Sequence, residues 1–204
     1  DGKFQNPQIM LGLLVGEEGL PLGYDIFEGN TFEGHTLLPV LKKIRAKYGL
    51  ENPVVVADAA LLSKENIAAL TQAGYSFILG GRIHNESETT KSAILDQSGS
   101  LRQGESFVFK KPDGTRLIVA YSRNRAKKDA MNRQKGVKKL QGRIRSGRLT
   151  KEHINNRGYN KFLRIQGEAL VEIDDSKIEA DAKWDGLKGY VTNTDLPADK
   201  AIEN

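Results

Sequence analysis

The chain has 204 residues, of which 38% are hydrophobic and 28% are charged, and it contains no cysteine. This composition indicates a globular protein rather than a disordered one. The lack of cysteine excludes disulfides, thiolate zinc sites, iron–sulfur clusters and cysteine nucleophiles. The longest apolar run, Ile9–Val15, is far shorter than the roughly 20 residues of a membrane-spanning helix. We therefore expect no membrane partner, and a reducing cytoplasm suits a cysteine-free chain.

Positive charge is concentrated in one part of the chain. The formal net charge is only +5, but residues 110–164 hold 18 Lys/Arg against three Asp/Glu, a local charge of +15. The remainder of the chain then carries −10. This asymmetry predicts a basic binding region attached to an acidic core, with nucleic acid as the commonest polyanionic partner. The alternative is a solvated helix face rich in Lys and Arg.

The first 81 residues alternate strand and helix signals. The predicted order is β-β-α-β-α-β, at residues 7–15, 21–27, 37–48, 53–57, 63–73 and 76–79. The first two strands make a hairpin, and the β-branched run at 53–57 is predicted to be buried on both faces. Such alternation indicates an α/β fold.

After Gly81 the pattern changes. A short helix is predicted at 86–97, and a Pro-Asp-Gly turn between 105–110 and 116–122 predicts a hairpin. Residues 124–148 predict a long helix with one apolar stripe and Lys/Arg on its other faces. Further strands are predicted at 162–165, 169–173, 177–180 and 189–192. A last helix is predicted to begin at Pro197.

Asp58 is the first candidate for chemistry. It directly follows the predicted strand at 53–57, and sites in open α/β sheets form just beyond the carboxyl ends of strands. A carboxylate there can hold a divalent cation, although an aspartate in this place also suits a helix cap or a turn. Position alone leaves both readings open.

Other polar residues carry weaker signals. His35, His84 and His153 share no metal-ligand spacing, so capping or surface roles are favoured. Asp174 to Ser176 predicts a hairpin turn. The remaining acids of this stretch are predicted to face water rather than a metal: Glu172, Glu179, Asp181 and Asp185.

Several segments resemble one known family. They are GLPLGYDIFEGN at 19–30, TFEGHTLLP at 31–39, VVVADA at 54–59, RNRAKKD at 123–129 and WDGLKGYVTNT at 184–194. Together they resemble bacterial insertion-sequence transposases of the DDE class, in the branch whose RNase H-like core carries a large strand-rich insertion. The resemblance covers nearly the whole chain and implies an enzyme that cleaves and joins DNA strands.

The resemblance implies a two-metal site. In that family an Asp, a second Asp and a Glu hold two Mg²⁺ (or Mn²⁺) ions, and Asp58 matches the second acid. The first acid is expected upstream of Asp1, and the third downstream, in a motif of Tyr, two residues, Arg, three residues, Glu, six residues, Lys. Glu203 does not fit that motif. We therefore expect an internal fragment with one of three acids, weak or no metal binding, and no activity alone.

The resemblance also implies that different parts of the chain have different roles. Residues 1–81 are expected to form an incomplete RNase H-like core, 82–188 a basic β-rich (α+β) insertion that holds double-stranded DNA, and 189–204 a return strand and helix start. The candidate phosphate-binding residues are Arg123, Arg125, Lys127, Lys128, Arg133, Lys135, Lys138, Lys139, Arg143, Arg145 and Arg148. The full-length protein is expected to act as a homodimer on nucleoid DNA in the cytoplasm.

Two other functions remain open. One is a non-catalytic nucleic-acid-binding module that uses the same basic helix, and the other is an RNase H-like nuclease of another kind. The enzyme readings need two more acids near Asp58, whereas the binding module does not.

Overall fold

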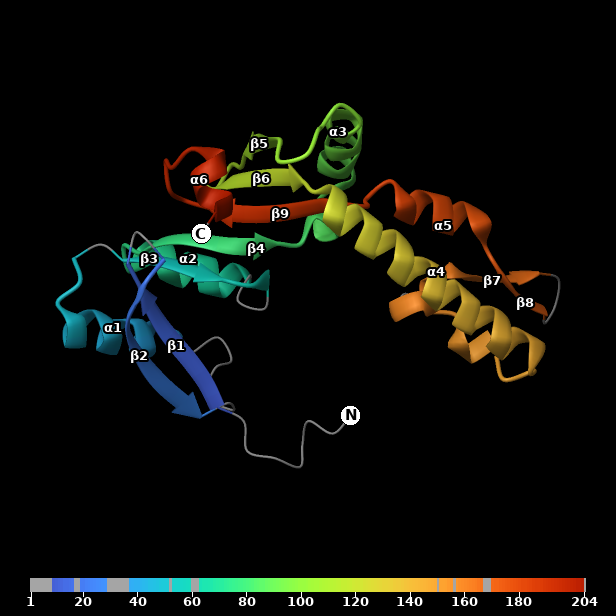
Figure 1. Cartoon of the computed structure of the whole chain (residues 1–204), viewed down its shortest axis with the longest axis horizontal. Helices are drawn as coiled ribbons and strands as arrows, with labels where there is room; N and C mark the ends of the chain where they lie inside the picture. The colour runs from blue at the N-terminus through green and yellow to red at the C-terminus, as the bar shows by residue number, and fades with distance from the viewer. Residues whose placement is uncertain are drawn as a thin grey trace. The chain divides into compact units, whose positions relative to one another are not determined.

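The structure is a computed structural model that describes residues 9–16, 19–28, 37–51, 53–59, 63–149, 151–155, 157–166 and 170–203. The chain divides into two compact units. Unit 1 comprises Asp1–Arg82, Lys110–Leu117 and Tyr190–Asn204, and unit 2 comprises Ile83–Phe109 and Ile118–Gly189. Figure 1 labels the helices and strands of both.

Unit 1 begins with the predicted hairpin. Strands β1 (Ile9–Val15) and β2 (Pro21–Glu28) pair antiparallel. Helix α1 (Leu37–Tyr48) follows, and its end at Gly49, with φ of 63°, confirms the predicted stop. The Tyr48 hydroxyl donates a hydrogen bond to the Tyr24 carbonyl of β2 (3.2 Å), which fixes the end of α1 against the hairpin.

A parallel β-α-β unit comes next. Strands β3 (Val54–Ala57) and β4 (Ser76–Gly81) pair parallel, and α2 (Lys64–Gln72) connects them and packs along β4 (Figure 1). The Ser63 side chain caps α2 by accepting from the Asn66 amide (3.0 Å), as predicted from the sequence. Leu70 of α2 is buried together with Phe77, Ile78 and Leu79 of β4. These four residues form the core of the β-α-β motif.

The prediction that the 53–57 strand is buried on both faces is wrong. Val55 is 8% exposed, but Val54 and Val56 are 43% and 49% exposed. The five-stranded sheet has the order β3-β4-β9-β6-β5, so β3 is an edge strand. In the described part of the chain only one of its faces is covered, whereas a continuous apolar run by itself suggests burial of both.

The other strands of this sheet come from later in the chain. Strands β5 (Ser106–Lys110) and β6 (Arg116–Tyr121) form the predicted hairpin, with Gly114 at φ of 82° in its turn. Strand β9 (Leu187–Thr192) lies between β4 and β6 in the strand order. The sheet is mixed, because β3 and β4 are parallel whereas β5 and β6 are joined by a tight turn.

Unit 2 is built around the predicted long helix. Helix α4 (Arg123–Arg145) begins after the cap residue Ser122 and ends before Gly147, which has φ of 65°. Its Leu140 packs with Phe162 and Leu163 in a buried apolar cluster. This unit also contains α3 (Glu88–Ser98), β7 (Leu163–Gln166), β8 (Leu170–Ile173) and the short 3-10 helices Ile83–Asn85, Lys151–His153 and Gly158–Phe162.

The predicted strand at 177–180 and the hairpin turn at Asp174 to Ser176 are both wrong. These residues form the start and body of helix α5 (Asp175–Ala182). Asp174 is the cap, and its carboxylate accepts hydrogen bonds from the amides of Ser176 (3.1 Å) and Lys177 (3.4 Å). An aspartate favours a helix cap as strongly as a turn, and the Lys, Glu and Ala that follow are strong helix formers.

The chain's last described helix is α6 (Ala198–Glu203), which begins directly after Pro197, one residue later than predicted. Across the described residues, no helix combines the length and the apolar character needed to cross a bilayer.

Candidate functional site

Asp58 lies where the parallel pair of unit 1 ends. It directly follows β3, and its side chain is exposed. Ala57 is opposite Leu79, so the backbone after β3 runs beside Gly80 of β4. A Cβ atom on Gly80 would lie 2.8 Å from the Ala59 nitrogen and 3.2 Å from the Asp58 carbonyl carbon. A side chain at position 80 would therefore push Asp58 out of place.

The role of Gly80, which allows the backbone after β3 to approach β4 closely, was not predicted from the sequence. The predicted strand ends at residue 79, but Gly80 and Gly81 both belong to β4. A glycine inside a strand pattern signals a close backbone approach, which was the available clue.

The described residues alone do not complete a metal centre. No group of three or more His, Asp or Glu able to share an ion is found among them. Asp58 supplies one hard oxygen ligand of the type that Mg²⁺ prefers. His84 lies in Ile83–Asn85 and His153 in Lys151–His153, whereas His35 lies outside the described residues.

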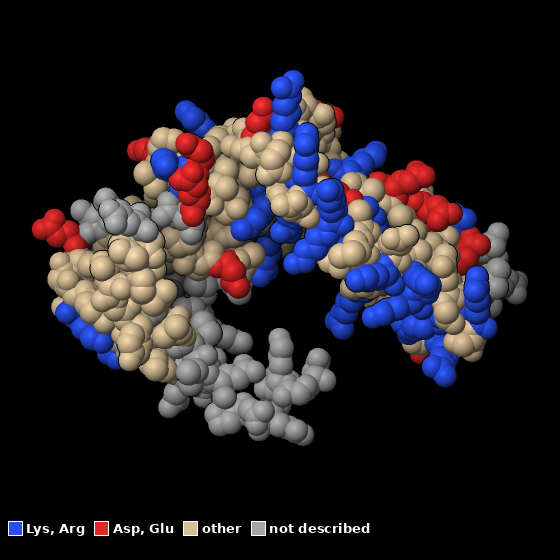
Figure 2. Space-filling view, viewed as in Figure 1, with Lys and Arg blue, Asp and Glu red and all other residues tan. Residues whose placement is uncertain are grey.

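The basic residues of α4 form a separate surface in unit 2. Figure 2 shows Lys and Arg gathered along α4 and Asp and Glu gathered over α5. At 100° per residue, one broad face of α4 lies opposite Arg133. The exposed cations on this face, here called the α4 cationic face, are Lys127, Lys128, Lys135, Lys138, Lys139 and Arg145. Arg123 is exposed at the start of α4, Arg143 is half-buried, and Arg148 is exposed beyond its end.

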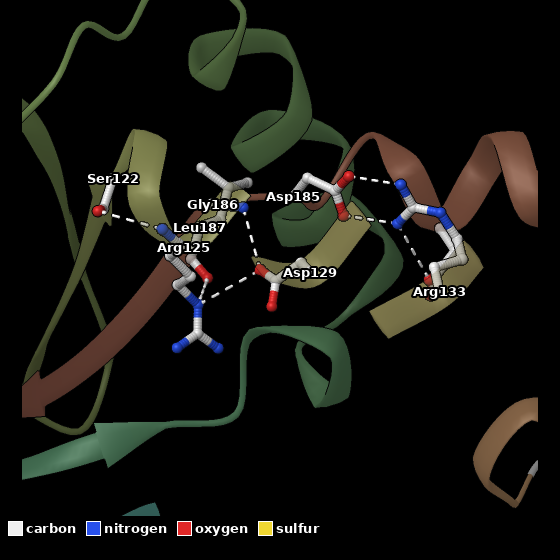
Figure 3. A network of polar contacts seen from close by, with 8 residues as sticks. Ser122, Arg125, Asp129, Arg133, Asp185, Gly186 and Leu187 are labelled. Carbon is white, nitrogen blue, oxygen red and sulfur yellow. Dashed lines mark hydrogen bonds and ion pairs between the residues drawn. The ribbon is translucent and has the colours of Figure 1, made fainter. Parts of the chain in front are cut away.

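Arg133 points to the opposite side of α4. Its guanidinium donates to both carboxylate oxygens of Asp185, at 2.6 and 2.5 Å, and lies 3.5 Å from Asp181 (Figure 3). The side chain is only 12% exposed. The hydrogen bonds to Asp185 raise the pKa of Arg133 above its usual value. Arg133 is thus committed to an internal ion pair and is poorly placed for phosphate.

Two further contacts join α4 to the turn before β9 (Figure 3). The Asp129 carboxylate accepts from the Gly186 amide (3.2 Å), and Arg125 Nε donates to the Leu187 carbonyl (3.2 Å). Gly186 has φ of 83°, and a Cβ there would lie 2.6 Å from the Tyr121 ring. The segments 123–129 and 184–194, which carry the family resemblance, therefore meet in space. The sequence contains no periodic pattern that predicts the contact between these two segments.

Three acids of the 172–185 stretch, Glu172, Asp181 and Asp185, pair with cations, whereas Asp175 and Glu179 are exposed. Asp181 pairs with Lys161 as well as with Arg133, and Arg164 Nε donates to Glu172 (2.5 Å). The expectation that Asp181 and Asp185 simply face water is wrong, because their side chains are 23% and 18% exposed.

A polar hollow lies beside this network. Its volume is about 310 Å³, and its lining includes His84, Trp184, Lys161 and Asp181. The His84 and Trp184 rings lie 4.6 Å apart between centroids. Partial desolvation, followed by the charge of Lys161, lowers the pKa of His84. A neutral imidazole is favoured there at neutral pH.

Comparison with known families gives a match over residues 2–200 to the family described as Transposase DDE domain. The chain belongs to this family. The resemblance to insertion-sequence DDE transposases is thereby confirmed, and the α/β structure with its mixed sheet agrees with the RNase H-like fold expected of such a domain. In two further comparisons, no curated protein and no solved structure matches the chain.

Proposed function

We propose that this transposase domain contributes Asp58 to a metal-dependent site that cleaves and joins DNA strands, and that the α4 cationic face holds the DNA. The observation that carries the first part is the place of Asp58, exposed at the carboxyl end of a parallel strand pair beside a glycine that leaves it room. In this proposal residues 82–188 are the DNA-holding insertion, which also adds the β5–β6 hairpin to the core sheet, and 1–81 with 189–204 belong to the core.

Asp58 would supply one ligand to Mg²⁺ or Mn²⁺. Bound divalent ions would activate the attacking oxygen and stabilise the leaving oxygen of the phosphodiester. One carboxylate does not hold two such ions in octahedral geometry, so the remaining acids are expected from other parts of the transposase.

The test of Asp58 is plasmid nicking in Mg²⁺ and in Mn²⁺. The purified 204-residue chain is expected to leave the plasmid intact. In the full-length transposase, Asp58→Asn is expected to reduce cleavage by at least roughly a thousandfold, since it removes a metal-binding charge while keeping the shape. Asp96→Asn, an exposed carboxylate of α3, is the matched control and should cleave normally.

Two outcomes would contradict this part of the proposal. One is nicking by the 204-residue chain that disappears in Asp58→Ala. The other is a full-length Asp58→Asn variant that cleaves as fast as the wild type.

DNA binding by the α4 cationic face is testable on the chain itself. Replacing Lys128, Lys135 and Lys139 by Gln removes three charges that lie within one narrow arc of the helix. We expect weaker binding to any duplex sequence, and a slope of log K against log salt smaller by about two to three, since each lost phosphate contact removes about 0.9. Fluorescence anisotropy with a labelled duplex at several salt concentrations measures both.

The control variant carries the same charge change in unit 1. Lys42 and Lys43 are exposed on α1, and Lys64 is exposed as the first residue of α2. Their replacement by Gln should leave the salt slope near the wild-type value. Equal losses in the two triple variants would reduce the effect to net charge and reject a localised DNA-binding face.

A further inference from the structure

The end of β9 and the segment that leads from it to α6, residues 192–197, are hydrogen-bonded to the start of β4. The Thr192 hydroxyl donates to the Phe77 carbonyl (2.6 Å). The Asn193 side chain accepts from the Phe77 amide (2.9 Å) and donates to the Tyr75 carbonyl (3.0 Å). The Asn193 side chain thus makes the hydrogen bonds to β4 that the backbone of a neighbouring strand would otherwise make, at the point where β9 ends. These contacts fix the segment on one side.

Arg116, the first residue of β6, holds the same segment from another strand. Its Nη2 donates to the carbonyls of Thr194 and Leu196, the latter at 2.7 Å, and so uses both hydrogens of that nitrogen. Thr194 is itself fixed, because its amide donates to the Thr192 hydroxyl (3.0 Å). All of these residues belong to unit 1.

A role in packing alone does not account for the guanidinium. Its Nε is buried and has no hydrogen-bond partner in the described part of the chain, which costs desolvation free energy. A methionine at this position would fill a similar stem volume without that cost. What the guanidinium adds is the pair of hydrogen bonds to backbone carbonyls just before α6.

The hydrogen bonds of Arg116 lie directly before helix α6, beside Pro197, which also favours a helix start. Helix α6 starts at Ala198, two residues after Leu196, and Ala201 is its one buried residue in the described part. Because Leu196 lies two residues before Ala198, a fixed Leu196 carbonyl restricts where the first turn of α6 begins. Family resemblance expects the third catalytic acid on the helix that begins here.

We propose that Arg116 is a positioning residue that sets the start and direction of α6 and, through it, the catalytic helix of the transposase. The catalytic part of this inference rests on the proposed function. The Arg116 guanidinium donates to the backbone carbonyls of Thr194 and Leu196, so its effect on cleavage would be exerted through α6 and not on the reacting atoms.

Hydrogen exchange in the 204-residue chain tests the positioning role directly. We expect Arg116→Met to speed amide exchange in 198–203 by about tenfold while β4 and β9 keep wild-type protection. Arg116→Lys keeps the charge and the donors and should restore part of the protection. Lys110→Met, an exposed cation at the end of β5, is the matched control. Unchanged exchange in α6, or equal acceleration in β4 and β9, would overturn the proposal.

Cleavage by the full-length transposase tests the consequence. Arg116→Met is expected to lower kcat about tenfold or more with little change in DNA affinity, and Arg116→Lys to recover part of it, because a misplaced catalytic group affects the chemical step. If the wild type does not cleave, the proposed function fails but the exchange result stands. If the wild type cleaves and Arg116→Met has the same kcat, the catalytic role of Arg116 fails.

Discussion

The two sides of α4 are both rich in positive charge, yet they differ in what the charge touches. On one side, Arg133 is 12% exposed and is bound to Asp185 and Asp181, while Arg125 donates to the Leu187 carbonyl. On the other side, the α4 cationic face points to solvent. The sequence places both kinds of residue in one basic run. Pairing and exposure, rather than the number of charges, separate the residues that hold the helix from those that the proposed function assigns to DNA.

Breaking the Arg133 ion pair should give the largest effect on stability. Arg133→Met leaves two poorly exposed carboxylates, Asp185 and Asp181, without their shared cation. We expect a loss of about 2–4 kcal/mol in the free energy of unfolding, measured by urea denaturation. The salt slope of DNA binding should stay near the wild-type value, because Arg133 faces inward.

A second variant makes this prediction sharper. Adding Asp185→Asn to Arg133→Met removes the stranded charge and should recover part of the lost stability, as a double-mutant cycle measures. If Arg133→Met unfolds at the wild-type urea concentration but loses DNA affinity, the comparison between the two sides of α4 is wrong.

Gly136 and Gly142 lie on the two different sides of α4, and their replacement should change stability by an intermediate amount. A Cβ on Gly136 would lie 2.2 Å from the Tyr159 ring, whereas a Cβ on Gly142 would have no neighbour within 4 Å. Gly142→Ala should stabilise the chain by about 0.5–1 kcal/mol through helix propensity. Gly136→Ala should destabilise it by about 1–3 kcal/mol, because Tyr159 must move. Thermal unfolding of the two variants measures opposite shifts, and shifts of the same sign would contradict the packing of this helix.

The elements of this chain were more predictable than its contacts. Helix α2 was recognisable because Ser63 is a cap and Gly74 a stop, and the β5–β6 hairpin because of its Pro-Asp-Gly turn. These signals depend on residues that are close in the sequence, so they hold in any tertiary structure. Helix α5 was misread because Asp174 serves equally well in a turn and in a cap, and only its environment decides.

The candidate site was predictable in part for the same reason. Asp58 stands out because it ends an apolar run, which is a local feature. The roles of Gly80, Gly186 and Arg116 depend on residues distant in the sequence, and the pairing of Arg133 with Asp185 spans 52 positions. No single-sequence pattern records such contacts, so Arg133 was grouped with the DNA-binding cations.

The smallest expected effect on stability belongs to the α4 cationic face. Replacing Lys128, Lys135 and Lys139 by Gln removes exposed charges of like sign from neighbouring helical positions, so the free energy of unfolding should change by less than about 0.5 kcal/mol. Urea denaturation at low and at high salt measures this change, and it should lie near zero at high salt because repulsion is then screened. A loss comparable to that of Arg133→Met would mean that these lysines also hold the fold. The difference between the two sides of α4 would then lie only in exposure and not in function.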